Sequence, residues 1–273
     1  MLRIVDHGEV RELEMASAAS RLTGFKVSAY LHRGTLIDTG FPRAKAELAR
    51  WLRSNPVQGA IVTHWHEDHA GNVPLLVRSG IPVTLGGDTL ARVRAVRRLP
   101  LYRWAVWGNP EPFDGTPVPA VHPFELVPTP GHTDDHVAVW DPMAGIAFTG
   151  DLWLGVRASV VHPNENPIAM VSSLKRVLAL EPAVVFDAHR GVLRDPVKAF
   201  TAKIAWLERT IDTILELDRR SYSEDRITRE VIGREDATTM LSRGEMSKRN
   251  FVRAVLRESP EGRRPPVGEF RAP

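Results

Sequence analysis

The sequence predicts an α/β fold for the 273-residue chain. Short apolar runs rich in β-forming residues alternate with stretches of helical composition, which is the pattern of strands separated by helices. Four of these runs are predicted to be buried strands: residues 59–63, 125–128, 145–149 and 183–186. A polar cluster that contains histidine or aspartate follows each run. Because α/β sheets place functional residues just past the strand ends, we expect these clusters to belong to one site.

The segments between these runs complete the prediction for the first two thirds of the chain. Two further strands, residues 25–31 and 35–38, are joined by a turn sequence at residues 32–34. Helices are predicted at residues 43–53, 68–79, 89–98 and 168–180. Residues 99–123 are rich in proline, glycine and tryptophan and are predicted to form a long loop.

The character of the chain changes after residue 195. Residues 197–218 carry an apolar stripe at helical spacing and predict a long amphipathic helix. Three shorter segments follow: helices at residues 224–232 and 247–258, the second with Ser247 as its N-cap, and a Pro- and Arg-rich tail at residues 259–273 that is typical of disorder. We therefore predict a catalytic domain over residues 1–195 and a helical C-terminal extension over residues 196–273.

Composition limits the chemistry that the chain can perform. It has no cysteine, which excludes disulfides, thiolate metal sites and cysteine nucleophiles, so any transition metal must bind to histidine and carboxylate. The formal net charge of +3 is too small and too scattered to indicate nucleic-acid binding by itself. The N-terminus lacks the apolar stretch of a signal peptide, and no run has the length of a membrane span. We expect a cytoplasmic protein with no membrane partner.

The strongest chemical signal is the segment 64–69, which reads His-Trp-His-Glu-Asp-His. Alternate side chains of an extended segment point the same way, so His64 and His66 can bind one ion together. Asp68 and His69 follow where the chain turns into a helix, and they can reach a second point nearby. Imidazole and carboxylate groups are the zinc ligands that remain when thiolates are absent. Three further candidate ligands follow the later runs: His132, Asp151 and His189.

These segments resemble the metal-binding motifs of the metallo-β-lactamase superfamily. Residues 63–72 resemble its HxHxDH segment, and three later segments resemble its second His, Asp and final His motifs: residues 129–133 (Thr-Pro-Gly-His-Thr), 148–151 (Phe-Thr-Gly-Asp) and 187–191 (Asp-Ala-His-Arg-Gly). The order and separations agree over residues 27–193. The resemblance implies a four-layer αββα sandwich of the hydroxyacylglutathione hydrolase-like or β-lactamase-like protein 2-like branch. In the latter branch the helical C-terminal extension resembles a winged helix.

The resemblance also implies a site for two zinc ions, with iron or manganese as alternatives. It assigns His64, His66 and His132 to the first ion. It assigns Asp68, His69 and His189 to the second ion, and places Asp151 between the two. Asp68 and Asp151 would be the catalytic carboxylates that balance the charge of the ions. A hydroxide bridging the metals would be the nucleophile, because metal binding lowers the pKa of water to about 7.

Three residues are candidates for supporting roles behind the ligands. Asp38 matches a superfamily aspartate that braces the site, with simple turn chemistry as the alternative. His136 lies close to His132 in sequence and is a candidate brace or proton donor. Arg190 follows His189 and is a candidate contact for an anion, with an outward or salt-bridged side chain as the alternative.

The favoured function is hydrolysis of a small thioester, ester or lactone, so the expected partner is a small acyl substrate. Zinc β-lactamases proper often place cysteine in the second metal site, and its absence here argues against that activity. The alternative is a phosphodiesterase or single-strand endoribonuclease that acts on single-stranded RNA with the same dizinc site. A non-catalytic zinc protein is less favoured, because seven candidate ligands exceed the four of a closed structural site. No feature of the sequence indicates an oligomeric state.

Overall fold

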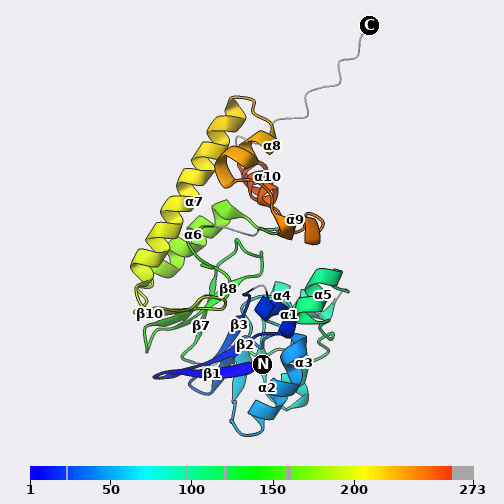
Figure 1. The fold of residues 1–273 in the computed structure, drawn as a ribbon. Coiled ribbons are helices and arrows are strands. Elements are labelled where there is room, and N and C mark those ends of the chain that lie inside the picture. Colours follow the sequence, from blue (N-terminus) through cyan, green and yellow to red (C-terminus); the bar gives the residue numbers. More distant parts are fainter. Residues whose placement is uncertain (23, 96–97, 120–121, 158–160, 260–273) are drawn as a thin grey trace.

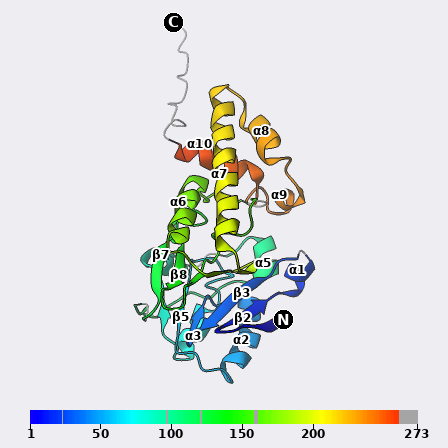
Figure 2. The same ribbon diagram turned by 90° about the vertical axis from the view of Figure 1, so that its left-hand side faces the viewer.

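The structure is a computed structural model that describes all residues of the chain except 23, 96–97, 120–121, 158–160 and 260–273. Two β-sheets pack against each other, and helices cover their outer faces (Figure 1, Figure 2). The predicted four-layer αββα sandwich is therefore confirmed. The predicted disordered tail, residues 259–273, lies outside the described residues apart from Ser259.

The first sheet has six strands in the order β1-β2-β3-β4-β5-β6. Their bounds are β1 Leu2–His7, β2 Val10–Met15, β3 Val27–His32, β4 Thr35–Ile37, β5 Gly59–Ile61 and β6 Val83–Thr84. Strands β1 to β4 pair antiparallel, whereas β4 pairs with β5, and β5 with β6, in parallel. Since parallel strands end at the same edge of a sheet, Asp38 and the segment 62–69 leave this sheet side by side.

The second sheet has five strands in the order β11-β10-β9-β8-β7. Their bounds are β7 Glu125–Pro128, β8 Val137–Asp141, β9 Ile146–Phe148, β10 Val184–Asp187 and β11 Gly191–Leu193. Strands β9 and β10 are parallel. As a result, Asp151 and His189, which follow these strands, also emerge at one shared edge.

Three apolar clusters define the layers. The cluster between the sheets consists of Val10, Tyr30, Ile37, Ile61, Phe124, Val139, Phe148 and Phe186. A second cluster joins the first sheet to α2 Lys45–Leu52, α3 Val73–Arg78, α4 Gly87–Arg94 and α5 Leu101–Trp107. A third joins the second sheet to α6 Pro167–Leu178, α7 Pro196–Arg219, α8 Glu224–Ile227 and α10 Lys248–Glu258. Burial of these clusters is the main term that stabilises the sandwich.

The C-terminal extension is helical, as predicted. The long helix α7 runs from the second sheet past its end, and α8 and α10 pack against it (Figure 1). The extension also contains a π-helix at Thr228–Ile232 and a short helix, α9 Ala237–Leu241. Helix α10 was predicted, and its predicted N-cap, Ser247, accepts a hydrogen bond from the amide of Arg249. Residues 196–259 contain no strand that could form the wing of a winged helix.

The structure corrects two of the predicted segments. The predicted loop 99–123 contains α5, because Trp107 at its end packs against Phe41 with ring centroids 4.9 Å apart and so anchors the helix in the core. The predicted helix 68–79 begins only at Val73. Residues 68–72 form turns instead, held in part by Asn72, whose amide donates to the carbonyls of Thr39 and Phe41. A further helix, α1 Ala18–Leu22, and a short 3-10 helix, Pro42–Ala44, complete the fold.

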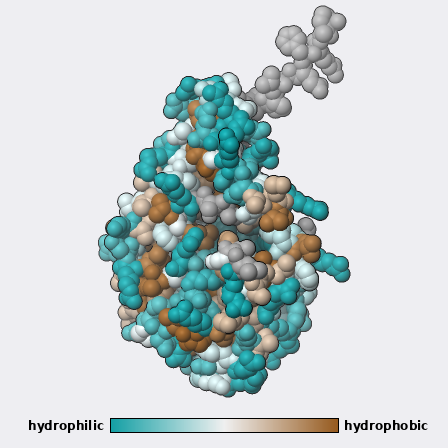
Figure 3. Space-filling model, viewed as in Figure 1, coloured by the Kyte–Doolittle hydropathy of each residue, from teal (hydrophilic) through white to brown (hydrophobic). Residues whose placement is uncertain are grey.

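The surface mixes hydrophilic and apolar residues. Figure 3 shows hydrophilic residues over much of one face, with apolar residues in small separate patches. Within the described part of the chain, no helix combines the length and the apolar character needed to cross a bilayer. The exposed large apolar side chains include Leu101 and Trp104 on α5. Trp104 also stacks under the guanidinium of Arg43, 5.0 Å from its ring centroid.

Candidate metal centre

The segment after β5 places four candidate ligands in one compact turn. His64 and His69 are fully buried, and His66 and Asp68 are nearly so. The turn closes through hydrogen bonds from the amides of His69 and Ala70 to the carbonyl of His66, 3.0 and 2.8 Å long. This reversal, which begins at His66, turns the side chains of residues 68 and 69 toward a different point from those of residues 64 and 66.

The remaining candidates come from three separate loops, each shaped by a local constraint. Gly131 holds a φ of +145°, and a Cβ there would lie 2.7 Å from the Cα of Met170, so only glycine allows the loop of His132 to lie against α6. Asp151 follows the tight turn at Gly150. His189 lies in a turn in which the Asp187 carboxylate accepts hydrogen bonds from the amides of residues 189 and 190, 3.0 and 2.8 Å long.

One group of side chains consists of His64, His66, His132 and Asp151. Nε2 of His64 and Nε2 of His132 each lie 3.0 Å from Nδ1 of His66. Tetrahedral zinc with Zn–N bonds of 2.0–2.1 Å places its nitrogen ligands about 3.3 Å apart. The three imidazoles therefore converge at nearly the spacing that one ion requires.

A second group consists of Asp68, His69 and His189. Nε2 of His189 lies 3.4 Å from Oδ2 of Asp68. Asp151 lies between the two groups. Its Oδ2 is 3.3 Å from Nε2 of His132, while its Oδ1 is 3.1 Å from Nε2 of His69 and 3.3 Å from Nε2 of His189. The structure thus brings all seven sequence-predicted residues together and places a different oxygen of Asp151 toward each group.

Hydrogen bonds on the far side of the rings indicate which nitrogens carry lone pairs. Nδ1 of His189 lies 2.5 Å from the carbonyl of Lys26, which can only accept, so this nitrogen carries the proton. Nδ1 of His69 lies 2.8 Å from the Asp38 carboxylate, with the same consequence. The Nε2 atoms of both rings face carboxylates, an arrangement that repels unless a cation, either a proton or a metal ion, lies between them.

Among the buried side-chain atoms of the described residues that have no hydrogen-bond partner are Nε2 of His69 and Oδ1 of Asp151, which face each other at this centre. Buried polar atoms normally have partners, because an unsatisfied one costs about 1–3 kcal/mol. A divalent cation would satisfy both atoms, and a set of imidazoles and carboxylates is suited to zinc and similar ions. The residues present therefore fit the metal ions that the sequence predicts.

The electrostatics of the two groups differ. Burial, together with neighbouring imidazoles, lowers the pKa of His64 and His66 well below the ordinary value, and burial lowers the pKa of His132 to about 3. These three rings are therefore neutral and suited to binding a metal. Burial also lowers the pKa of His69 and His189, but the nearby carboxylates, Asp151 foremost, outweigh it and raise the pKa of both rings. The second group thus attracts positive charge more strongly.

Two of the three supporting candidates brace this centre. Besides contacting His69, the Asp38 carboxylate accepts hydrogen bonds from the amide and hydroxyl of Thr63, 2.8 and 3.0 Å long. Nε2 of His136 accepts a hydrogen bond of 3.1 Å from the amide of Asp151. Arg190 is exposed instead, and its Nε donates to the carbonyl of Leu154 at 3.1 Å, although the side chain borders the cavity described next.

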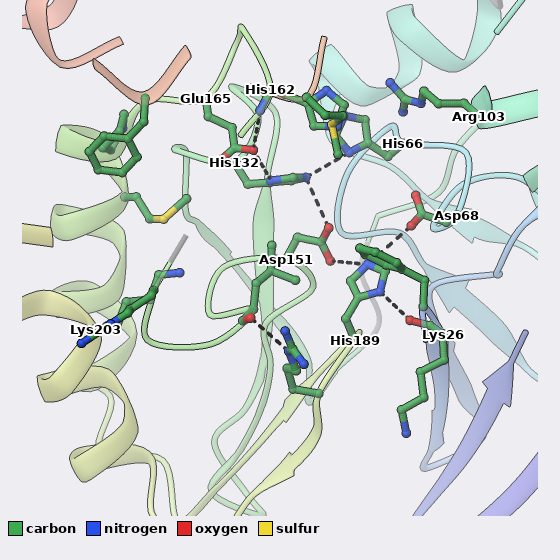
Figure 4. A pocket seen from close by; sticks show the side chains of 18 of the residues that line it. Lys26, His66, Asp68, Arg103, His132, Asp151, His162, Glu165, His189 and Lys203 are labelled. Carbon is green, nitrogen blue, oxygen red and sulfur yellow. Dashed lines mark hydrogen bonds and ion pairs between the residues drawn. The ribbon is translucent and has the colours of Figure 1, made fainter. Parts of the chain in front are cut away.

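A cavity of about 360 Å³ opens onto the centre (Figure 4). His66, Asp68, His132, Asp151 and His189 form its floor. One wall consists of apolar side chains from α6, α7 and α10 and from the segment just before α10: Pro167, Met170, Leu207, Phe251 and Met246. The cavity thus combines a polar floor with an apolar wall, as small-molecule sites usually do.

Sequence reasoning did not find three charged residues that line this cavity. Arg103 of α5 donates two hydrogen bonds of 2.6 Å to the buried carboxylate of Glu67. Glu165 lies with Oε1 3.7 Å from Nδ1 of His132, and burial raises its pKa to about 8. Lys203 of α7 is 4% exposed. All three lie outside the motifs, and no local pattern distinguishes them from surface charges.

The family comparison covers most of the region that forms the centre. The family model described as the metallo-beta-lactamase superfamily matches residues 22–189. An atrochrysone carboxyl ACP thioesterase of Aspergillus fumigatus is 31% identical over 193 residues, which cover 69% of this chain and 42% of that protein. A beta-lactamase-like protein 2 homolog of Drosophila melanogaster is 28% identical over 214 residues, covering 67% of this chain and 68% of that protein. The chain thus spans less than half the length of the fungal thioesterase.

Solved structures support the fold. A metallo-beta-lactamase family protein of Thermus thermophilus superposes with a TM-score of 0.65 at 18% identity, covering 91% of this chain and 92% of that chain. The DIM-1 metallo-beta-lactamase, in a crystal exposed to ceftazidime, superposes with a TM-score of 0.60 at 20% identity, covering 76% of this chain and 97% of that chain. At these identities the likeness concerns the fold alone.

Proposed function

The chain belongs to the metallo-beta-lactamase superfamily, and on this premise we propose that it hydrolyses a small acyl thioester, or a related ester or lactone, at a dinuclear metal centre. The family and its thioesterase-named relatives identify a hydrolase. One observation carries the finer proposal. The two oxygens of Asp151 face two different groups of histidines at the floor of a cavity that has an apolar wall.

We assign His64, His66 and His132 to one divalent ion, Asp68, His69 and His189 to the other, and Asp151 to both. Zinc is the favoured metal because the ligands are imidazoles and carboxylates without thiolates, and iron or manganese are the alternatives. When bound, such ions polarise an acyl carbonyl and lower the pKa of water to about 7. Asp68 and Asp151 would balance part of the positive charge of the metal ions, and Asp151 would link the two groups of ligands.

The rest of the cavity binds and orients the substrate. The side chains of Met170, Leu207 and Phe251 offer an apolar surface to an acyl chain beside the polar floor. This surface also keeps water away from the acyl chain of the substrate, so that burial of that acyl chain contributes to the free energy of binding. The volume of about 360 Å³ lies near the lower limit for ligand sites, which favours a small acyl group over a polynucleotide.

The proposal is tested by measuring metal content by elemental analysis and by screening the metal-loaded protein against thioesters, esters, lactones, phosphodiesters and single-stranded RNA. Asp151→Ala should lower turnover more than about 100-fold, since loss of even an outer partner of a metal ligand costs 10- to 100-fold. Asp134→Ala is the matched control, because Asp134 lies in the same part of the chain as His132 but is exposed, and its ion-pair partner among the described residues is Arg92.

The screen also separates the two candidate functions. Thioester turnover that is insensitive to salt and lost in Asp151→Ala supports the proposed acyl hydrolase. Cleavage of single-stranded RNA, with binding that weakens steeply as salt rises, would support the endoribonuclease instead. A purified protein that holds no metal and accepts none would refute both functions.

A further inference from the structure

Lys203 is a buried lysine in the wall of the active-site cavity. It lies on α7, and Leu207, one helical turn later on the same face, lines the same cavity. In Figure 4 its side chain approaches from the helix opposite Asp68 and Arg103, with Asp151 between. Since lysine is almost never buried unless it is paired, its place in a substrate cavity requires a physical reason.

The contacts of the Lys203 ammonium leave its charge without a counter-ion. It donates to two neutral acceptors, the carbonyls of Trp153 and, at 3.2 Å, Gly155. No ion pair of Lys203 with a carboxylate is found among the described residues. Glu165, the carboxylate with the strongest electrostatic influence on Lys203, is engaged elsewhere. Its Oε1 accepts from the amide of His162 at 3.0 Å and faces His132.

The surroundings make an unpaired cation here costly. A buried charge that lacks a partner destabilises a protein by several kcal/mol unless hydrogen bonds or a ligand compensate for it. Burial lowers the pKa of Lys203, but only to about 8, so the side chain is still mainly protonated at neutral pH. The cavity wall therefore presents a positive charge beside the apolar side chains of Met170 and Phe251.

We propose that Lys203 binds a carboxylate at the far end of the acyl group, so that the preferred substrates are thioesters of dicarboxylic acids. This inference rests on the proposed function and specifies its substrate class. The reacting carbonyl would lie at the polar floor near Asp151, the methylene chain would lie along the apolar wall, and the terminal carboxylate would pair with the Lys203 ammonium. A neutral acyl chain of the same length would leave that ammonium unpaired, which disfavours its binding.

The test compares coenzyme A thioesters matched in length: glutaryl against pentanoyl, and adipyl against hexanoyl. The metal-loaded wild type should hydrolyse the carboxylated member of a pair with the higher kcat/KM. Lys203→Met should lower kcat/KM for that member by about 10- to 100-fold, the range expected for a lost hydrogen-bonded charge, and change it for the neutral member by less than about threefold. Lys203→Arg should keep the preference. Lys198→Met, at an exposed position in the first turn of the same helix, is the matched control and should behave as wild type.

Several results would overturn the inference. Equal hydrolysis of both members by the wild type would do so while leaving the proposed function intact. An equal loss on both members in Lys203→Met would indicate that the lysine only holds the segment 153–155. If the wild type hydrolyses no thioester, the proposed function fails. In that case the binding of glutarate and pentanoate, read from the rise in melting temperature, still tests the carboxylate site. Glutarate should stabilise the wild type more than pentanoate does, and Lys203→Met should abolish this difference, whereas a difference that persists in the variant would refute the site.

Discussion

Replacing Asp38 with asparagine tests whether this residue fixes the tautomer of His69. The Asp38 carboxylate accepts hydrogen bonds on both sides, from Thr63 and from Nδ1 of His69. Asparagine offers one acceptor and one donor in the same shape. Because the Thr63 amide can only donate, the asparagine oxygen must face it, and the NH₂ group then faces His69.

This change would move a proton to the wrong side of the ring. With an NH₂ group opposite Nδ1, His69 is favoured in the tautomer that carries its proton on Nε2, the atom that faces Asp151. The alternative orientation of the asparagine places two donors against each other at Thr63. To bind a metal through Nε2, His69 must carry its proton on Nδ1, where it then faces a donor instead of a carboxylate, so the metal-bound variant loses one hydrogen bond to a charged group, worth about 1.5–3 kcal/mol. Since each 1.4 kcal/mol is a factor of ten, metal affinity of the second group should fall about 10- to 100-fold.

The backbone adds no competing effect. Asp38 has a φ of +62°, a conformation in which asparagine is as well tolerated as aspartate. The assay is a titration of the metal-free protein with zinc against a chelator of known affinity, which resolves the weaker of two ions. Asp141→Asn is the matched control, because Asp141 is also buried and pairs with His32 and Arg33, 2.7 Å away in each case, but contacts none of the candidate ligands. Wild-type affinity for both ions in Asp38→Asn would refute the reasoning.

Three further predictions concern stability. Arg103→Met should destabilise the protein by about 3–5 kcal/mol in denaturant unfolding, because it leaves the buried Glu67 carboxylate unpaired, and adding Glu67→Gln should restore part of this loss. Partial burial raises the pKa of Glu235, but hydrogen bonds from two hydroxyls and two amides at the start of α10 outweigh it and bring the pKa to about 2. Its contribution is therefore complete above the unfolded value of about 4.3 and is lost as pH falls toward 2. Glu235→Gln should lower the melting temperature at pH 7, and the difference from wild type should shrink between about pH 4 and 2. Finally, a fragment of residues 1–195 should not unfold cooperatively, and a stable, soluble fragment would instead support the predicted domain boundary.

The candidate centre could be predicted from the sequence because its residues follow strands. Alternation in an extended segment explains why His64 and His66 converge, and the parallel pairing of β9 with β10 explains why Asp151 and His189 emerge together. Both effects depend on residues close to the ligands in sequence, so short motifs are enough to predict them. The same applies to α7, whose apolar stripe predicted a helix over residues 197–218, against Pro196–Arg219 in the structure.

The segments that sequence reasoning missed depend on distant partners. Helix α5 lies in a stretch rich in proline and glycine, and its position depends on Trp107 packing against Phe41 and on the ion pair of Arg103 with Glu67. Nothing near residue 103 in sequence indicates that pair. The predicted start of α3, at residue 68, is too early for a related reason. The side chain of Asn72 donates hydrogen bonds to backbone carbonyls more than thirty residues away in sequence, and these hold the segment before α3 in turns.

The C-terminal helices contribute to the site as well as to the fold. Phe200, Leu207 and Phe251 share one apolar cluster with the second sheet, and Leu207 and Phe251 also line the active-site cavity. The motifs that predict the metal ligands end before residue 196, so the side chains of α7 and α10 that we propose to contact an acyl group lie outside those motifs. Because the floor and the wall come from different parts of the chain, substrate preference can change through substitutions on α7 and α10 while the ligands stay fixed. A variant such as Lys203→Met should therefore alter which acyl group is hydrolysed without altering metal content.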